Sequence, residues 1–128
     1  MAVDGLKLNS VNHVVTMVSD TKRSMEFYCD FLGFEHIPSQ VDNPNITWLV
    51  LPNGVMLHLI ETEEAPAKPD NIHHAFEVAN FDSAATAVEG HGIVIERSGV
   101  RHDGQRFMFF RDPDGNRVEL CTPSGFGS

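Results

Sequence analysis

The sequence predicts an α+β fold made of two copies of one module, each with the order strand, helix, strand, strand, strand. The first indication is that His13 and His73, which are 60 residues apart, each open a run rich in strand-forming residues. The second is that His58 and Glu119, which are 61 residues apart, each lie four residues after a glycine in a predicted hairpin turn. An internal repeat of this kind sets the architecture. The chain is therefore expected to be a single domain over residues 1–128 with two repeated modules, residues 8–62 and 72–123.

The first module begins with an apolar, β-branched run over residues 11–18, which predicts a strand. Asp20 is placed to cap a helix over residues 21–31, whose apolar side chains recur at helical spacing, and Gly33 is a typical stop signal. Three further strands are predicted after this helix: residues 34–38, 47–51 and 55–62. A loop over residues 39–45 and a turn at Pro52-Asn53-Gly54 separate them.

The second module repeats this order after a proline-containing linker over residues 63–71. A strand is predicted at residues 72–78, and Asn80 can cap a helix that ends near Glu89. The three remaining strands are predicted at residues 93–97, 106–111 and 117–122. The last two form a hairpin, because Asp112-Pro113-Asp114-Gly115 has the residue types of a type I turn. A polar loop is expected over residues 101–105 and a mobile tail over residues 123–128.

Composition excludes several classes of protein. The formal net charge is −9 and no basic cluster is present, which argues against nucleic acid as a partner. No apolar run approaches the roughly 18 residues of a membrane span. The two cysteines form no CxxC pattern, and the N-terminus shows no secretory signal, so a reducing cytoplasm is the expected location. Anionic substrates remain compatible with the charge, since a bound cation would reverse the local sign.

The repeat also predicts a site. Side chains alternate across a strand, so matching positions in two related modules can face one cavity. A pseudo-twofold axis between the modules would bring His13, His58, His73 and Glu119 together. Imidazole and carboxylate ligands suit Zn, Ni, Fe or Mn, and two histidines with one carboxylate suit Fe(II). The predicted metal ligands are His13, His58, His73 and Glu119.

Other polar and aromatic residues have simpler interpretations. His74 points to the opposite face from His73, and His36 and His91 are expected in solvated positions. His102 is also expected to be solvated; the alternative is that it lies, together with Arg101 and Arg106, on a loop over the site. Cys121 shares the face of Glu119 and is expected to be a small buried residue. The aromatic residues are expected in the core or in the wall of a cavity; these are Trp48, Phe107 and Phe109.

Four sequence runs resemble the vicinal oxygen chelate superfamily, which contains glyoxalase I, fosfomycin-resistance proteins, bleomycin-resistance proteins and extradiol dioxygenases. The resemblance covers about residues 8–123. The runs are Val11-Asn12-His13-Val14-Val15, Ser24-Met25-Glu26-Phe27-Tyr28 through Leu32-Gly33-Phe34, His73-His74-Ala75-Phe76-Glu77-Val78, and Phe110-Arg111-Asp112-Pro113-Asp114-Gly115-Asn116-Arg117-Val118-Glu119-Leu120.

The resemblance implies paired βαβββ modules whose curved mixed sheets surround a metal-binding cavity. It matches His13 and His73 to the first-strand ligands and Glu119 to the glutamate of the last strand. His58 stands where glyoxalase I has a glutamate, which leaves Glu119 as the single carboxylate of the set and the candidate catalytic residue. This sequence therefore departs from the pattern of glyoxalase I at its fourth ligand, which is His58 instead of a glutamate.

The function implied is that of a divalent-metal-dependent enzyme, a glyoxalase-like lyase or isomerase acting on a small oxygenated metabolite chelated through vicinal oxygens. Three alternatives stay open: an Fe(II) extradiol-type dioxygenase, a fosfomycin-type thiol transferase, and a non-catalytic drug-binding protein. A homodimer is expected, because each module presents an open sheet. In the expected form the modules are exchanged between chains, and the alternative is pairing within one chain.

Overall fold

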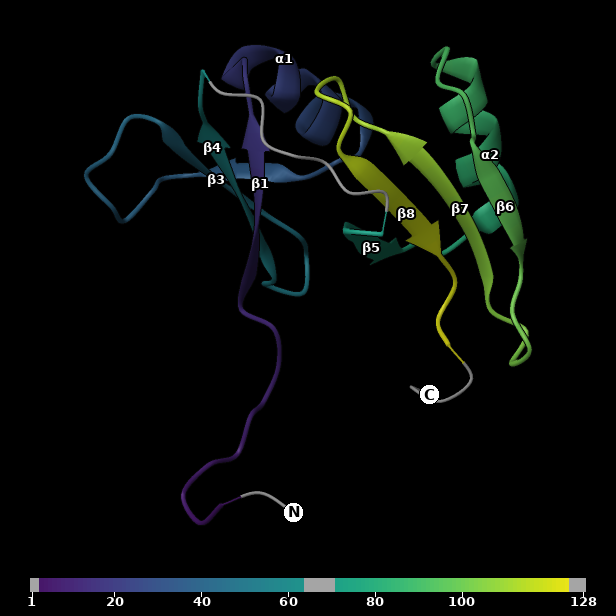
Figure 1. Ribbon diagram of the computed structural model, residues 1–128, viewed down its shortest axis with the longest axis horizontal. Helices are drawn as coiled ribbons and strands as arrows, with labels where there is room; N and C mark the ends of the chain where they lie inside the picture. Colours follow the sequence, from purple (N-terminus) through teal and green to yellow (C-terminus); the bar gives the residue numbers. More distant parts are fainter. Residues whose placement is uncertain (1–2, 64–70, 125–128) are drawn as a thin grey trace. The chain divides into compact units, whose positions relative to one another are not determined.

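The computed structural model describes residues 3–63 and 71–124, and the chain divides into two compact units, Met1–Glu64 and Ala65–Ser128. Each unit contains a four-stranded mixed sheet with one helical segment between its first and second strands (Figure 1). This is the predicted strand–helix–strand–strand–strand order in both units, and it confirms the α+β, two-module βαβββ fold. The predicted linker and tail fall mostly outside the described residues.

The sheet of the first unit has the strand order β1-β4-β3-β2, in which β1 and β4 are parallel and the other pairs are antiparallel. Its elements are β1 (His13–Val18), α1 (Thr21–Met25), η1 (Glu26–Phe31), β2 (Glu35–Ile37), β3 (Ile46–Val50) and β4 (Met56–Glu61). Side chains alternate across these strands, so each strand contributes to two faces. One face is the core, where Val18, Leu49, Leu57 and Leu59 are buried. The other face carries His13, Trp48 and His58.

The helical segment of the first unit has the predicted extent but not the predicted geometry. Asp20 caps it as expected, since its side chain accepts a hydrogen bond from the Arg23 backbone N–H. The second half, η1, is a π-helix in which the backbone N–H of Leu32 bonds the carbonyl of Phe27. The wider turn lets the adjacent residues Phe27 and Tyr28 both enter the core. No helix in the described ranges is long and apolar enough to cross a membrane.

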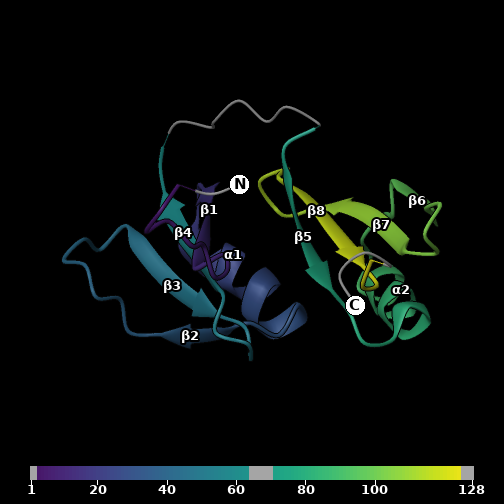
Figure 2. The same cartoon turned by 90° about the horizontal axis from the view of Figure 1, so that it is seen from below.

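The sheet of the second unit has the same plan, with the strand order β5-β8-β7-β6 and a parallel β5–β8 pair (Figure 2). Its elements are β5 (His73–Glu77), α2 (Phe81–Gly90), β6 (Arg97–Val100), β7 (Arg106–Arg111) and β8 (Arg117–Cys121). The Arg106 guanidinium lies 4.3 Å from the centre of the Phe81 ring and pairs with Asp82. Helix α2 therefore covers the sheet face that carries Arg106, and Glu119 lies on the opposite face.

The second strand of the second module was predicted in the wrong place. Residues 93–97 were expected to form it, whereas the structure has a strand at Arg97–Val100 and no regular element over residues 93–96. Ile93 and Ile95 are each half-buried between exposed neighbours, which gives the alternation of a strand without a partner. Backbone pairing starts only where the N–H of Glu96 bonds the carbonyl of Phe109, because the preceding residues lead from α2 to the sheet edge.

Candidate metal centre

In the first unit, His13 and His58 lie side by side on one face of the parallel pair β1–β4. Val15, two residues after His13, is the ladder partner of His58, so both histidines point the same way. Their rings stack with 4.2 Å between centroids and 14° between planes. Trp48, the partner of His58 on β3, stacks on the other side at 4.4 Å and 7°. His58 is therefore held between two rings and is only 8% exposed.

The ring nitrogens of this pair suit a metal ion. His13 Nδ1 lies 2.7 Å from Asn12 Oδ1, and in the tautomer in which Nδ1 donates this hydrogen bond the lone pair for a metal is on Nε2. His58 Nε2 is buried and has no hydrogen-bond partner among the described residues. Such an unpaired buried group costs about 1–3 kcal/mol, which a bound cation would offset. Burial, and then the neighbouring His13, lower the pKa of His58, which favours the neutral form that metals bind.

In the second unit, His73 and Glu119 occupy the corresponding ladder positions. Ala75, two residues after His73, is the partner of Glu119 on β8. His73 Nε2 lies 2.9 Å from Glu119 Oε1, and Arg101 Nη1 lies 3.2 Å from Oε2, so both carboxylate oxygens have a partner. Phe109, the partner of Glu119 on β7, meets the His73 ring edge-on at 5.0 Å. Glu119 is 4% exposed, and its charge is balanced by Arg101.

The ladder register gives the two pairs the same place in each unit, so His13 corresponds to His73 and His58 to Glu119. His73 Nδ1, like His58 Nε2, is buried without a hydrogen-bond partner among the described residues. Each unit contributes two donors, and within residues 3–63 and 71–124 no group of three or more His, Cys, Asp or Glu side chains is arranged to hold a metal. A single centre made from all four residues stays a prediction.

The other predicted residues take different roles. Arg101 reaches Glu119, in agreement with the alternative of a loop over the site, whereas Arg106 packs with α2 on the opposite face and does not. Cys121 is buried against Phe107 and Phe109. Burial, followed by the charges of Glu119 and Glu77, raises the pKa of the Cys121 thiol, so it is a packing residue rather than a reactive one.

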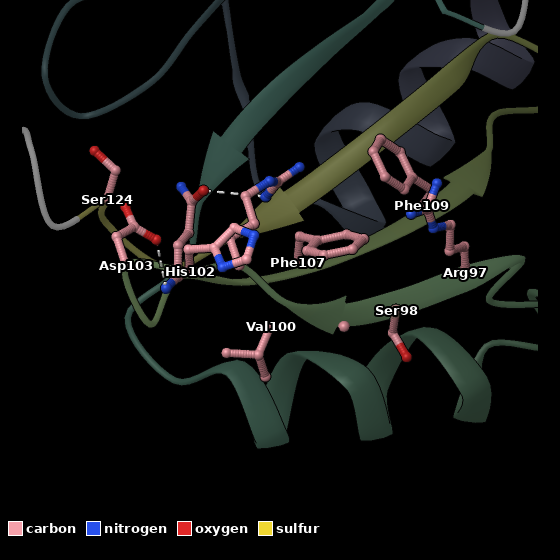
Figure 3. Close-up of a pocket in the computed structure, with 11 residues that line it drawn as sticks. Arg97, Ser98, Val100, His102, Asp103, Phe107, Phe109 and Ser124 are labelled. Atoms are coloured by element: carbon pink, nitrogen blue, oxygen red, sulfur yellow. Dashed lines mark hydrogen bonds between the residues drawn. The ribbon is translucent and has the colours of Figure 1, made fainter.

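A recess of about 870 Å³ lies beside Glu119 on the outer strands of the second unit. Figure 3 shows the Phe107 ring in its lining, with Arg97 and Phe109 on one side of the ring and His102 on the other. The sequence had left His102 in solvent or over the site, and the structure places it at this recess. Arg97 was expected at the end of a strand and given no role.

Sequence reasoning also missed the contact of Trp48 with His58. The signal was present, because the hairpin turn at Pro52-Asn53-Gly54 sets the register of β3 against β4 and makes Trp48 the partner of His58. Arg101 lies in the loop after β6, as predicted, and its position agrees with the alternative that this loop lies over the site. No sequence pattern indicated that the partner of Arg101 is Glu119.

Comparison with known proteins identifies the family. Residues 10–120 match the model of the Glyoxalase/Bleomycin resistance protein/Dioxygenase superfamily, and the chain belongs to that superfamily. YaeR of Escherichia coli K12 is 32% identical over 90% of this chain and 97% of its own length. Glyoxylase I 4 of Arabidopsis thaliana is 32% identical over 91% and 72%, and glutathione transferase FosA of Serratia marcescens is 29% identical over 91% and 83%.

The solved structures agree with the fold. Lactoylglutathione lyase from Agrobacterium tumefaciens has a TM-score of 0.76 and 21% identity, with 94% of this chain and 98% of that one covered. At this identity the likeness concerns the fold alone. The superfamily includes enzymes, among them the glyoxylase and the transferase named above, and small-molecule substrates fit its members.

Proposed function

We propose that the chain is a divalent-metal-dependent enzyme of the glyoxalase type, a lyase or isomerase that acts on a small metabolite with two adjacent oxygens. The observation that carries the proposal is the pair of equivalent donor sets, His13 with His58 and His73 with Glu119, on equivalent strands of two repeated units. The similarity to Glyoxylase I 4 of Arabidopsis thaliana supports this class of chemistry.

The donor set fits a metal. His13 and His58 offer imidazole nitrogens that the protein leaves unpaired, and Glu119 offers a carboxylate that is almost wholly buried. In the proposal all four residues, His73 included, hold one Zn, Ni, Fe or Mn ion. When bound, such an ion supplies Lewis-acid stabilisation of negative charge on the substrate oxygens.

Glu119 is the proposed base. It is the single carboxylate of the donor set, since the equivalent position in the first unit is His58. In an isomerisation, one carboxylate would therefore both remove a proton from one carbon and return it to the neighbouring carbon. In the metal-free chain His73 and Arg101 each contact one oxygen of Glu119, and the burial of this carboxylate limits its contact with water.

A second candidate is a transferase that adds a thiol to an oxygenated substrate. It is favoured by the similarity to glutathione transferase FosA and by Arg97 and Arg101 in the lining of the recess, which suit an anionic substrate. The two candidates differ in stoichiometry. A thiol transferase consumes one thiol per turnover, whereas an isomerase acting on a thiol adduct of a 2-oxoaldehyde leaves the carbon–sulfur bond in place and consumes no further thiol.

We also propose that the working form is a homodimer with exchanged modules, so that His13 and His58 come from one chain and His73 and Glu119 from the other. The exposed side chains of Val15 (43%) and Met17 (39%), on the same face of β1 as His13, support an assembly that covers this face. Analytical ultracentrifugation measures the mass directly, and a monomer at micromolar concentration would contradict the dimer.

Metal titration of the metal-free protein tests the proposal. Calorimetry with Zn²⁺, Ni²⁺ and Mn²⁺ should give one ion per four-donor site for the native chain and much weaker binding for His13→Ala and for Glu119→Ala. The matched controls are His36→Ala, on the exposed edge strand β2, and His74→Ala, beside His73 but on the other face of β5. Equal losses in the controls, or no stoichiometric binding by the native chain, would rule out this site.

A further inference from the structure

The recess of the second unit is built around one aromatic ring. Phe107 on β7 is the ladder partner of Gly99 on β6, and a Cβ atom at Gly99 would lie 3.0 Å from Phe107 Cζ. Real Cβ atoms essentially never come closer than this, so the ring lies over β6 only because the facing residue has no side chain. The result is a flat apolar surface that opens into a recess of about 870 Å³.

Two guanidinium groups lie over this ring. The Cζ of Arg101 is 4.1 Å from the ring centre, and that of Arg97 is 5.6 Å from it. No acidic side chain among the described residues pairs with Arg97. Asp103 also lines the recess, and Arg101 is paired with Glu119, so Arg97 is the guanidinium of the lining that has no ion-pair partner among the described residues. A guanidinium beside an apolar ring is able to bind an oxyanion.

Arg101 also connects the recess to the candidate metal centre. Its Nη1 donates to Gln105 Oε1 at 3.0 Å and to Glu119 Oε2 at 3.2 Å. The side chain of Arg101 is 39% exposed, whereas that of Glu119 is 5% exposed, so the arginine has room to turn and the carboxylate does not. The Arg101 charge can therefore face Glu119 or an anion in the recess.

We propose that the recess binds an oxyanion group of the substrate, a phosphonate or a carboxylate, through Arg97 and Arg101, and that Arg101 couples this binding to metal binding by Glu119. The inference rests on the proposed function, since it requires Glu119 to be a metal ligand. Arg101 acts here as a positioning residue, because its effect on the metal is exerted through Glu119.

The coupling follows from competition for one carboxylate oxygen. A cation on Glu119 repels Arg101, which occupies Oε2 in the metal-free chain. An anion in the recess gives Arg101 another partner and frees Oε2 for the metal. Coupling between two sites is reciprocal, so metal binding tightens anion binding by the same factor, and such factors are on the order of 5-fold or more.

The experiment is a titration of the purified, metal-free, full-length protein with Ni²⁺ at constant ionic strength. It is carried out in sodium chloride alone, with added methylphosphonate, and with added acetate. The native chain should bind Ni²⁺ about 5-fold more tightly with the effective anion. Tightening by methylphosphonate alone assigns the recess to phosphonates, and tightening by acetate alone assigns it to carboxylates. Chelation of Ni²⁺ by the free anion would act in the opposite direction.

Two charge-matched variants separate the coupling from general electrostatics. Arg101→Gln should bind Ni²⁺ more tightly than the native chain without anion and should lose the anion effect. Arg97→Gln should keep the native affinity for Ni²⁺ without anion and need more anion to reach the same tightening. Weaker Ni²⁺ binding by Arg101→Gln, equal tightening in both variants, or a native affinity that no anion changes would each overturn the coupling.

Anion binding to the metal-free protein gives an independent readout. Chemical-shift changes of the Gly99 and Phe107 amides on addition of methylphosphonate or acetate should saturate in the native chain and be weakened at least several-fold in Arg97→Gln. If the native chain binds no metal, the proposed function and the coupling both fail, but these shifts still decide whether the recess binds an oxyanion. If metal binds and the shifts are absent, the recess proposal alone is wrong.

Discussion

The two donor pairs have the same ladder positions but differ in how they stand without a ligand. In the first unit, His58 lies between two stacked rings, and its Nε2 is buried with no hydrogen-bond partner among the described residues. In the second unit, Glu119 has His73 on one oxygen and Arg101 on the other. The first pair therefore has a buried ring nitrogen that is free of hydrogen bonds to the described residues. The carboxylate oxygens of the second pair are already bonded, and these bonds would have to be shared or broken when a metal binds.

This difference predicts different energetics of metal binding at two otherwise equivalent positions. Metal binding to the first pair would remove the free-energy cost of an unpaired buried nitrogen, because that nitrogen gains a partner. Binding to the second pair exchanges one set of charge interactions for another, so the result depends on what else Arg101 can contact. We infer that the first pair sets a basal affinity for metal, and that the second makes the site responsive to substrate.

The largest expected effect comes from removing the carboxylate that the first unit lacks. Glu119→Gln should lower turnover by about 10²- to 10⁴-fold, the usual contribution of a positioned base, and should weaken metal binding as well. The fold should survive, because the two side chains have nearly the same shape. Steady-state kinetics, calorimetry and a thermal unfolding curve measure the three effects. The control is Glu77→Gln, which should retain activity. Glu77 lies on the same sheet face, two residues after Ala75, the ladder partner of Glu119.

Mixing two inactive variants tests whether the unlike pairs belong to different chains. His13→Ala and Glu119→Ala should each be inactive alone. After subunit exchange, an equal mixture should recover roughly a quarter of the native activity, since half of randomly paired dimers are heterodimers and each has one intact site of two. Exchange is verified by mass spectrometry of labelled chains. Complete exchange without recovered activity would place both pairs of a site within a single chain.

The aromatic stack should contribute to the first pair alone. Trp48→Leu removes the ring that holds His58, and the loss of stacking, about 0.5–1.5 kcal/mol, should weaken metal binding by about 2- to 10-fold. Trp48→Phe keeps a stacking ring and should lose less. Metal titration and urea unfolding separate a local effect from a global one. Equal metal affinity in Trp48→Leu would mean that the stack does not position His58.

A smaller effect is expected in the recess of the second unit. In Gly99→Ala the new methyl group would meet the Phe107 ring at 3.0 Å, so the ring must shift. Stability should fall by about 1 kcal/mol, and methylphosphonate or acetate should bind several-fold more weakly, with metal affinity in chloride unchanged. Gly90→Ala is the control, because a Cβ there meets nothing within 4 Å. Unchanged anion binding in Gly99→Ala would show that the ring does not form the binding surface.

The smallest effect is on the protonation of His58 in the metal-free chain. Burial, and then the positive charge that His13 can carry, lower the pKa of His58 below its ordinary value of 6.5. Substitution of His13 by Ala removes the second cause and should raise that pKa, leaving it below 6.5 because burial persists. NMR titration of the His58 Cε1 proton measures both values. A higher pKa in the native chain than in the variant would contradict the stacked arrangement.

Much of the fold follows from the sequence because it depends on local signals. Turn glycines, helix caps at Asp20 and Asn80, and alternating apolar residues predict strand and helix positions without knowledge of their partners. Strand β6 escaped this reasoning, because Arg97–Val100 is a polar edge segment that is fixed by backbone pairing with β7 rather than by apolar alternation. The π-helical turn escaped it as well, since a shift from i+4 to i+5 bonding leaves no mark on composition.

The repeat predicted equivalent positions for His13 and His73 and for His58 and Glu119, and the ladder register confirms this equivalence. Binding of one metal by all four residues stays a prediction. The contact of Arg101 with Glu119 depends on where β6 ends and on how the chain returns into β7, and each of these shifts by a residue or two without any change in pattern. Residues that follow from periodicity could be found in this way, whereas residues that depend on the path of a loop required the coordinates.

The parallel pairing of the first and last strands in each unit has a consequence for how the protein is made. Histidine and carboxylate in the second unit are 46 residues apart in the chain, and they meet only when β5 and β8 have joined. Contacts of such long range close late, because the entropy of closing the intervening chain is lost before the contact forms. A nascent chain at the ribosome therefore exposes His73 and Glu119 as separate side chains, and under the proposed function this pair would become available to a metal only after the module has been completed.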